Sequence, residues 1–325
     1  MMRLIWALLA VAVLGAAAWG GYWFIGARAM DRAVALALER NPAFTAESHK
    51  VRGFPNRFDL TLSAPQLAQG AVQWRAPFIQ FFALSYRLNH VIAVFAHDQL
   101  FSVNGQEMTL HSADMRASLV MAPDLSLPLE RFALVAQAPA LRISDETHRA
   151  DALRLASQAQ APWRHRLVIE LENAFPDPAA MASIDPQGHW PRRFEAIALE
   201  GEVEFDRPLD RQALESLPPR LSGWALTRAR LVFEGGAVEA RGRLISDARG
   251  LLSGEVVLEL RGWRDLIRRA RDAGLMPEEH EAFIMLALQG MSDAQDPERL
   301  EVPLSVRAGV VSLGPVVLGA IPPVF

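Results

Sequence analysis

Strand-type alternation of apolar and polar positions dominates the chain from about residue 42 to Arg261. In the stretch from Arg57 to Ser63, the apolar residues Phe58, Leu60 and Leu62 alternate with polar ones. A period of two is typical of a strand with one buried face. The same alternation recurs in segments 167–171, 197–206 and 254–260.

Turn residues between these segments predict how the strands are connected. Gly235-Gly236 separates two apolar segments and predicts a two-residue hairpin, because both central positions of such a turn need positive φ. A longer hairpin is predicted at Ser246–Gly250. Strands joined in this way, each with one apolar face, indicate an antiparallel meander. Ala-Pro-x-Leu occurs at Ala64, Ala122 and Ala138, and its proline suits strand entrances and edges.

Helical periodicity appears mainly late in the chain. Trp263, Leu266 and Ile267 share one face of a predicted helix that stops near Gly274. Pro277 then opens a second predicted helix near the C-terminus. A short helix is also expected at Asp210–Ser216. We therefore predict a mainly β (α+β) fold: an N-terminal transmembrane helix, then an antiparallel sheet domain with a few helices, two of them near the C-terminus.

The N-terminal segment is long and apolar enough to cross a membrane. No residue from Leu4 to Ala27 is charged, and a helix of this length spans a hydrocarbon core of about 30 Å. Aromatic rings at its far end suit the headgroup level and form the predicted membrane interface: Trp19, Tyr22, Trp23 and Phe24. The alternative is a cleavable signal peptide with small residues at Ala16–Ala18.

The expected organisation is a membrane anchor at 1–28, an amphipathic connecting helix at 29–41 and a β-rich domain at 42–325. The connecting helix would lie on the bilayer or cap one end of the domain. A Pro-rich stretch at 173–191 is the predicted boundary if the domain has two lobes. We expect the N-terminus in the cytoplasm and the domain outside, although the arginines on the two sides of the span discriminate little.

Composition narrows the classes of function. The chain has 325 residues, 51% of them hydrophobic and 22% charged, and a net charge of −4. Nearly balanced charge gives no sign of nucleic-acid binding. The absence of cysteine excludes disulfides, thiol catalysis and thiolate metal sites.

Few residues of the sequence suggest catalysis or metal binding. His97-Asp98 lies in a strand or turn where neighbours point to opposite faces, and His111 with Asp114 suits a turn. The acidic cluster at Glu278–Glu281 suits the first turn of a helix. We therefore predict no catalytic residues, no cofactor and no metal. A hydrolase is the least favoured class, because no nucleophile–base spacing is visible.

Tryptophans in the body are the best candidates for contact with an apolar ligand. The predicted lining consists of Trp74, Trp163 and Trp224, together with the first strand's Phe58, Leu60 and Leu62. Each tryptophan is also a good core or rim residue, and a core position is the favoured alternative.

Three segments carry a family resemblance: "VRGFPNRFDLTL", "GRLISDARGLLSGEVVLELRGWRDLI" and "VVSLGPVVLGAIPPVF". Together these segments resemble the domain of unknown function 2125 family of N-anchored envelope proteins, and the resemblance extends over nearly the whole chain. That family looks related to the AsmA-like group, whose members resemble elongated, groove-forming β-sheet proteins of the inner membrane. The resemblance implies an elongated, curved sheet with an apolar inner face and a role in lipid or envelope homeostasis. The resemblance does not identify any catalytic or binding residues.

Two functional hypotheses follow. In the first, a non-enzymatic, single-pass protein of the bacterial inner membrane binds lipid or another apolar ligand with its periplasmic sheet. In the second, a membrane-tethered interaction or assembly factor has a closed core and binds other envelope proteins.

Overall fold

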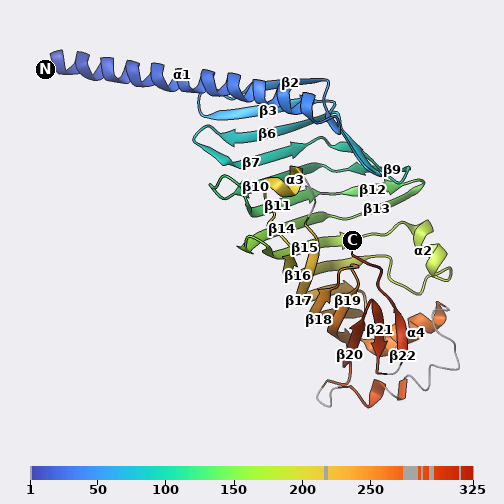
Figure 1. Ribbon diagram of the computed structural model, residues 1–325. Helices are drawn as coiled ribbons and strands as arrows, with labels where there is room; N and C mark the ends of the chain where they lie inside the picture. The colour runs from blue at the N-terminus through green and yellow to red at the C-terminus, as the bar shows by residue number, and fades with distance from the viewer. Residues whose placement is uncertain are drawn as a thin grey trace. The chain divides into compact units, whose positions relative to one another are not determined.

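The computed structural model describes residues 2–215, 219–273, 285–286, 288–292, 296–314 and 316–324. The fold is mainly antiparallel β with an N-terminal helix, as the alternation predicts (Figure 1). The chain divides into two compact units, Met1–Val120 and Met121–Phe325. The Pro-rich stretch 173–191 lies inside the second unit.

The first unit begins with one continuous helix, α1 (Met2–Arg40), which includes both the predicted span and the predicted connecting helix. Two groups of antiparallel strands follow it. The main sheet of this unit has the order β2 (Ser48–Arg52), β3 (Arg57–Ser63), β6 (Phe78–Leu84), β7 (Arg87–Phe95) and β10 (Asp114–Met121). The side sheet has the order β1 (Phe44–Thr45), β4 (Gln66–Gln69), β5 (Val72–Arg75), β8 (Asp98–Val103) and β9 (Gln106–His111).

Every second connection between strands of the first unit passes from one sheet to the other at a corner of two residues. The chain leaves β3 and enters β4 at Ala64-Pro65, and returns from β5 to β6 at Ala76-Pro77. The two corners are hydrogen-bonded to each other, from Ala64 N to Pro77 O (2.8 Å) and from Ala76 N to Pro65 O (3.2 Å). Ala64 has a φ of 46°, a left-handed conformation that turns the chain between the sheets. The Ala-Pro pair at Ala64 thus marks a junction between two sheets.

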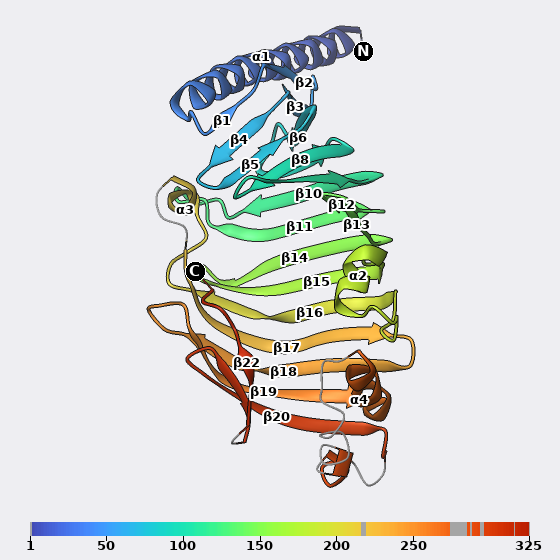
Figure 2. The same cartoon turned by 90° about the vertical axis from the view of Figure 1, so that its right-hand side faces the viewer.

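The second unit continues with a long meander (Figure 2). Its sheet has the order β11 (Leu129–Gln137), β14 (Ala152–Ala161), β15 (Arg164–Ala174), β16 (Phe194–Phe205), β17 (Leu221–Phe233), β18 (Gly236–Ser246), β19 (Leu252–Arg261), β20 (Arg299–Arg307), β21 (Val310–Leu313) and β22 (Val316–Ala320). The hairpin predicted at Gly235 joins β17 to β18, and Gly235 has a φ of 85°. Strands β12 (Ala140–Ile143) and β13 (Glu146–Arg149) pair with each other as an antiparallel hairpin.

Three helices of the second unit lie within the described residues. The helix predicted from Trp263 is present as α4 (Trp263–Asp272), and the short one after Asp210 as α3 (Arg211–Glu215). The third, α2 (Pro178–Ile184), begins at a proline inside the Pro-rich stretch and was not predicted. The helix predicted after Pro277 falls largely on residues outside those that the structure describes.

Buried apolar side chains gather at the C-terminal end of the second unit. Trp263 of α4 is fully buried, and its indole N–H donates to the carbonyl of Pro297 at 3.0 Å. Its cluster extends to Leu300, Val302 and Leu304 of β20. This end of the sheet is therefore covered by α4.

Candidate functional site

The sheet of the second unit has a continuous apolar surface on one side. Leu153, Leu171, Ile197 and Leu231 are register partners across β14–β17. Two residues further along each strand, a second row consists of Leu155, Ile169, Leu199 and Ala229. Since alternate residues of a strand share a side, both rows lie on the same side of the sheet. We call these two rows the apolar face.

The opposite side of the same strands carries ion pairs. Arg154 contacts Glu172, and Arg166 contacts Glu200 across neighbouring strands. Farther along, Arg230 Nε lies 3.0 Å from Glu239 Oε1. Partly exposed pairs of this kind contribute about 0–1 kcal/mol each, so their main effect is to keep this side of the sheet in water.

The apolar face lacks the burial of a core. None of its side chains belongs to the buried core of the described residues, and Ile197 is 38% exposed. The buried apolar clusters of the second unit lie instead on β18–β20 and the segments beyond them. Helix α2 packs on β13 and helix α4 on β18, away from the centre of this surface (Figure 2). A sheet side of this composition is normally covered by other structure or by a ligand.

Polar atoms are buried beside the apolar face. His165 of β15 is fully buried, and its Nδ1 lies 3.1 Å from Ser157 Oγ. Burial lowers the pKa of His165, because the imidazolium form loses its hydration. Its Nε2 and the indole Nε1 of Trp224 have no hydrogen-bond partner among the described residues. Sequence reasoning missed His165, although its spacing from Leu167 and Ile169 places it on the same side of the strand.

In the first unit, the apolar sides of the main and side sheets face each other. The side chain of Gln99, on β8, is 1% exposed and lies between the two sheets. It accepts a hydrogen bond from Trp74 Nε1 (3.0 Å) and donates one to Met115 Sδ of β10 (3.2 Å). Leu60 and Leu62 lie on this inner side of the main sheet, in register with Phe81 and Ile79.

The predicted apolar lining is therefore divided among different surroundings. Trp74, Leu60 and Leu62 lie on the inner sides of the first unit, whereas Phe58 is covered by α1. Trp224 is in register with Val203, at one end of the apolar side of the second unit. Its ring lies across Gly201, where an added Cβ would be 2.8 Å from the indole nitrogen. Trp163 lies in the turn between β14 and β15 and is 52% exposed, so it belongs to neither surface.

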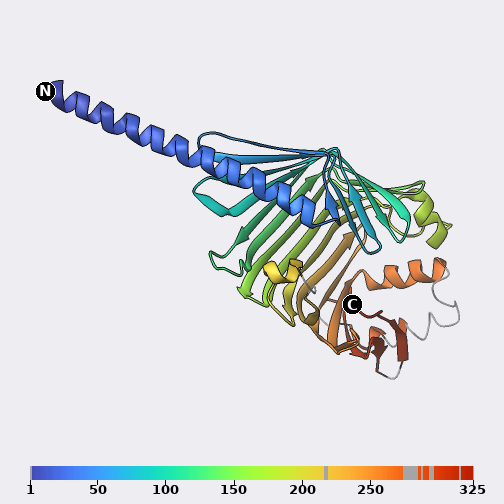
Figure 3. The same cartoon turned by 45° about the horizontal axis from the view of Figure 1, so that its top comes forward.

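The aromatic end of the predicted span contacts the first unit (Figure 3). Trp19 Nε1 donates to the carbonyl of Pro55 at 3.0 Å, and Tyr22 Oη donates to that of Ser85 at 2.7 Å. Trp23 is 6% exposed and stacks on Phe58. Phe24, 55% exposed, stacks on the ring of Phe54.

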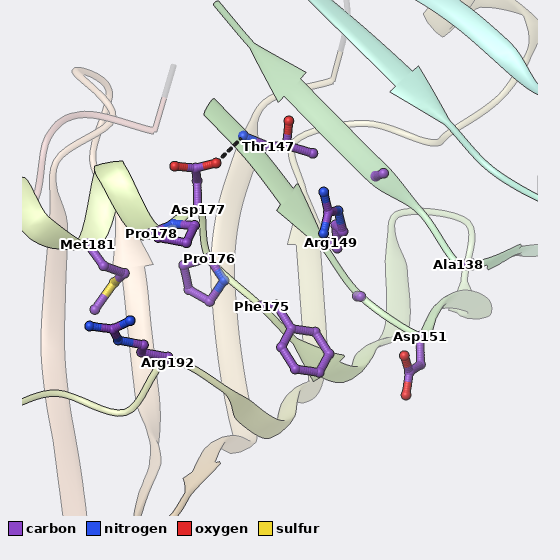
Figure 4. A pocket seen from close by; sticks show the side chains of 12 residues that line it. Ala138, Thr147, Arg149, Asp151, Phe175, Pro176, Asp177, Pro178, Met181 and Arg192 are labelled. Atoms are coloured by element: carbon purple, nitrogen blue, oxygen red, sulfur yellow. Dashed lines mark hydrogen bonds between the residues drawn. The ribbon is translucent and has the colours of Figure 1, made fainter. Parts of the chain in front are cut away.

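A pocket of about 640 Å³ lies beside α2 in the second unit (Figure 4). Its wall combines Phe175 and Met181 with the charged side chains of Arg149, Asp177 and Arg192. The N–H groups of Thr147 and Ala179 donate to the Asp177 carboxylate and lower its pKa. Asp177 thus caps α2 and holds it to β13, which is a structural role.

In the structure, the histidines and aspartates considered as acid–base candidates contact partners other than those with which the sequence pairs them. His111 Nδ1 lies 2.7 Å from Asp98 Oδ1 on the facing strand, and both side chains are exposed. His97 contacts the backbone carbonyl of Ser112, and Asp114 pairs with Arg116. The Glu278–Glu281 cluster lies outside the described residues. Within the described part of the chain, no three His, Asp or Glu side chains come together as a metal site.

Comparison with protein-family models gives a match. A family model described as "Uncharacterized protein conserved in bacteria (DUF2125)" matches residues 23–322. Neither the curated proteins nor the solved structures contain a match. The match confirms the family that the sequence segments resemble. It begins at Trp23, the residue of α1 that stacks on Phe58.

Proposed function

We propose, for a chain that belongs to this uncharacterised bacterial family, a non-enzymatic role in holding lipid acyl chains at a membrane. In this proposal the chain is a single-pass protein of the inner membrane with its β-rich units in the periplasm. The acyl chains lie on the apolar face of the second unit and on the inner sides of the first. This is the lipid-handling role that the resemblance to AsmA-like proteins implies.

The apolar N-terminal helix supports the membrane part of the proposal. Residues Ile5–Arg40 of α1 include a stretch long and apolar enough to cross a membrane, and only 6% of its most apolar window is buried within the protein. An uncovered apolar helix of this length is expected in lipid. Retention of the helix, rather than its removal as a signal peptide, is part of the proposal.

The uncovered apolar face is the observation that carries the lipid-binding part. Burying apolar surface contributes roughly 25 cal/mol per Å², so the apolar area that these two rows of partly buried side chains still expose is unfavourable in water. Charged side chains occupy the opposite side of the same strands, which makes the asymmetry a property of the sheet. Acyl chains match this surface in polarity and bind without directional contacts.

Site-specific photocrosslinking tests the proposal. Benzoylphenylalanine is placed at Leu199, on the apolar face, in the full-length chain expressed in bacterial cells. The matched control carries it at Glu200, the next residue, whose side chain points to the opposite side of the sheet. We expect lipid adducts at Leu199 and none at Glu200. Equal labelling, or protein adducts alone at Leu199, would contradict lipid binding.

A second candidate function is supported by the last strand. Val317 and Leu318 of β22 are 66% and 55% exposed, and β22 ends the strand order of its sheet. An exposed apolar edge strand can pair with a strand of another protein. This favours the interaction-factor hypothesis, for which crosslinking from Leu318 in cells should yield one defined protein adduct.

A further inference from the structure

Two turns of the first unit lie against the membrane-length part of α1. The β2–β3 turn contributes the carbonyl of Pro55, and the β6–β7 turn contributes that of Ser85. Both accept hydrogen bonds from aromatic side chains of the helix, Trp19 and Tyr22. The N-terminal half of α1 projects beyond both turns (Figures 1 and 3). The turns are therefore the part of the sheet nearest to the free half of the helix.

Helix length sets the depth of these turns relative to a bilayer. Twenty residues from Leu4 end at Trp23, and at 1.5 Å per residue they span about 30 Å, the thickness of a hydrocarbon core. Trp19 lies four residues before that end, or roughly 6 Å inside it. The backbone carbonyls of Pro55 and Ser85, which accept hydrogen bonds from Trp19 and Tyr22, thus lie near the boundary between the hydrocarbon core and the headgroups.

The side chains of the two turns are suited to that layer. Phe54 and Tyr86 are 55% and 68% exposed, and neighbouring Leu88 is 51% exposed. No acidic residue occurs in segments 52–57 or 84–88, whereas Arg52 and Arg87 do, together with Arg57, which is ion-paired with Asp59 at 2.7 Å. Aromatic rings flanked by arginines favour the boundary between headgroups and acyl chains, where arginine also approaches lipid phosphates.

We propose that the β2–β3 and β6–β7 turns of the first unit dock into the headgroup layer of the bilayer crossed by α1. Phe54 and Tyr86 insert into the layer, and the hydrogen bonds to Trp19 and Tyr22 hold the turns at this depth. The first unit then stands with its inner apolar sides next to the membrane surface. This inference rests on the membrane anchoring proposed above.

Single-cysteine labelling of the full-length chain tests the docking, since the chain contains no cysteine of its own. Leu8→Cys, Tyr86→Cys and Leu100→Cys are labelled with an environment-sensitive fluorophore and reconstituted into vesicles of phosphatidylethanolamine and phosphatidylglycerol. Some of the lipids carry a nitroxide quencher. Leu8 reports on the span, and Tyr86 reports on the proposed docking. Leu100, 40% exposed, is separated from Tyr86 by the whole of β7 and lies on the side of β8 opposite to Gln99, away from the inner side of the first unit, so it is the control.

We expect blue-shifted, lipid-quenched emission at Leu8 and Tyr86, and water-like emission at Leu100. Quenching at Leu8 with water-like emission at Tyr86 would overturn the docking and leave the anchor intact. Water-like emission at Leu8 would overturn the anchoring itself. Quenching at all three positions would also contradict docking through the turns, because the whole unit would then be associated with lipid.

Discussion

The ring of Trp23 in α1 stacks on the ring of Phe58 in β3, with centroids 5.9 Å apart and planes inclined by 21°. The indole N–H of Trp23 also donates to the carbonyl of Arg57 at 2.6 Å. Ala27 and Met30 extend the contact along the helix. The apolar helix is thus part of the core of the first unit, and the position of the span is coupled to the sheet by packing.

Truncation of Phe58 should strongly destabilise the first unit. Phe58 is 3% exposed, and Phe→Ala at such sites costs about 3–5 kcal/mol of unfolding free energy. Phe54 also contacts Trp23 but is 55% exposed, so Phe54→Ala should cost much less. Denaturant unfolding of the two full-length variants in detergent measures the difference. Equal losses would show that the contact between Trp23 and Phe58 is not part of a core.

The glycines of α1 should differ in their tolerance of alanine. An added Cβ at Gly26 would lie 2.8 Å from Phe58 Cζ. Among the described residues, an added Cβ at Gly21 would instead point into open space. Because Phe58 is held under Trp23, Gly26→Ala should lower the unfolding free energy by about 1–3 kcal/mol. Gly21→Ala should leave it unchanged or raise it, since alanine favours helix. Thermal unfolding of both variants provides the comparison, and a stabilised Gly26→Ala would contradict the packing.

A charge on the apolar face should abolish lipid binding without unfolding the sheet. Ile197 is already 38% exposed, so Ile197→Asp should cost little in the ligand-free protein. Against an acyl chain, the buried carboxylate should weaken binding of a fluorescent fatty acid by ~10-fold or more. Ile245 is 57% exposed on the opposite side of the same sheet, and Ile245→Asp is the matched control. Similar affinities for both variants would exclude the apolar face as the binding surface.

The stability of the second unit should fall as the pH drops below about 6.5, the ordinary pKa of histidine. Burial lowers the pKa of His165 in the folded protein, so the unfolded chain takes up the proton first. The folded state therefore loses stability progressively as the pH falls between the two pKa values, the full penalty remains below the lower one, and it is absent above the higher one. His165→Gln should flatten this dependence between about pH 5 and 7 in denaturant titrations. An unchanged pH dependence would assign it to other groups.

The alternation of apolar and polar residues was sufficient to predict the strands and their sides. Leu167, Ile169 and Leu171 share one side because the strand period is two, and register with β16 then extends the surface to Leu199. The positive φ required at Gly235 likewise predicted its hairpin. Such features depend on neighbours within a few residues, which is why the sequence alone reveals them.

Features that depend on distant segments could not be predicted. Ala64 adopts a left-handed φ that alanine rarely takes, and only its bond to Pro77 on the returning strand explains the corner. The aromatic end of α1 is suited to a membrane interface, yet the partner of Tyr22 is Ser85, 63 residues away. Helix α2 was missed because its N-cap, Asp177, lies among prolines that favour a linker.

Native mass spectrometry of the full-length chain, released from detergent micelles after purification from bacterial membranes, tests the central claim most directly. The account predicts a population carrying about one or more phospholipids per chain, because acyl chains cover the apolar face. That population should disappear in Ile197→Asp and persist in Ile245→Asp. A lipid-free spectrum for the wild-type chain under conditions that preserve its fold would contradict the claim.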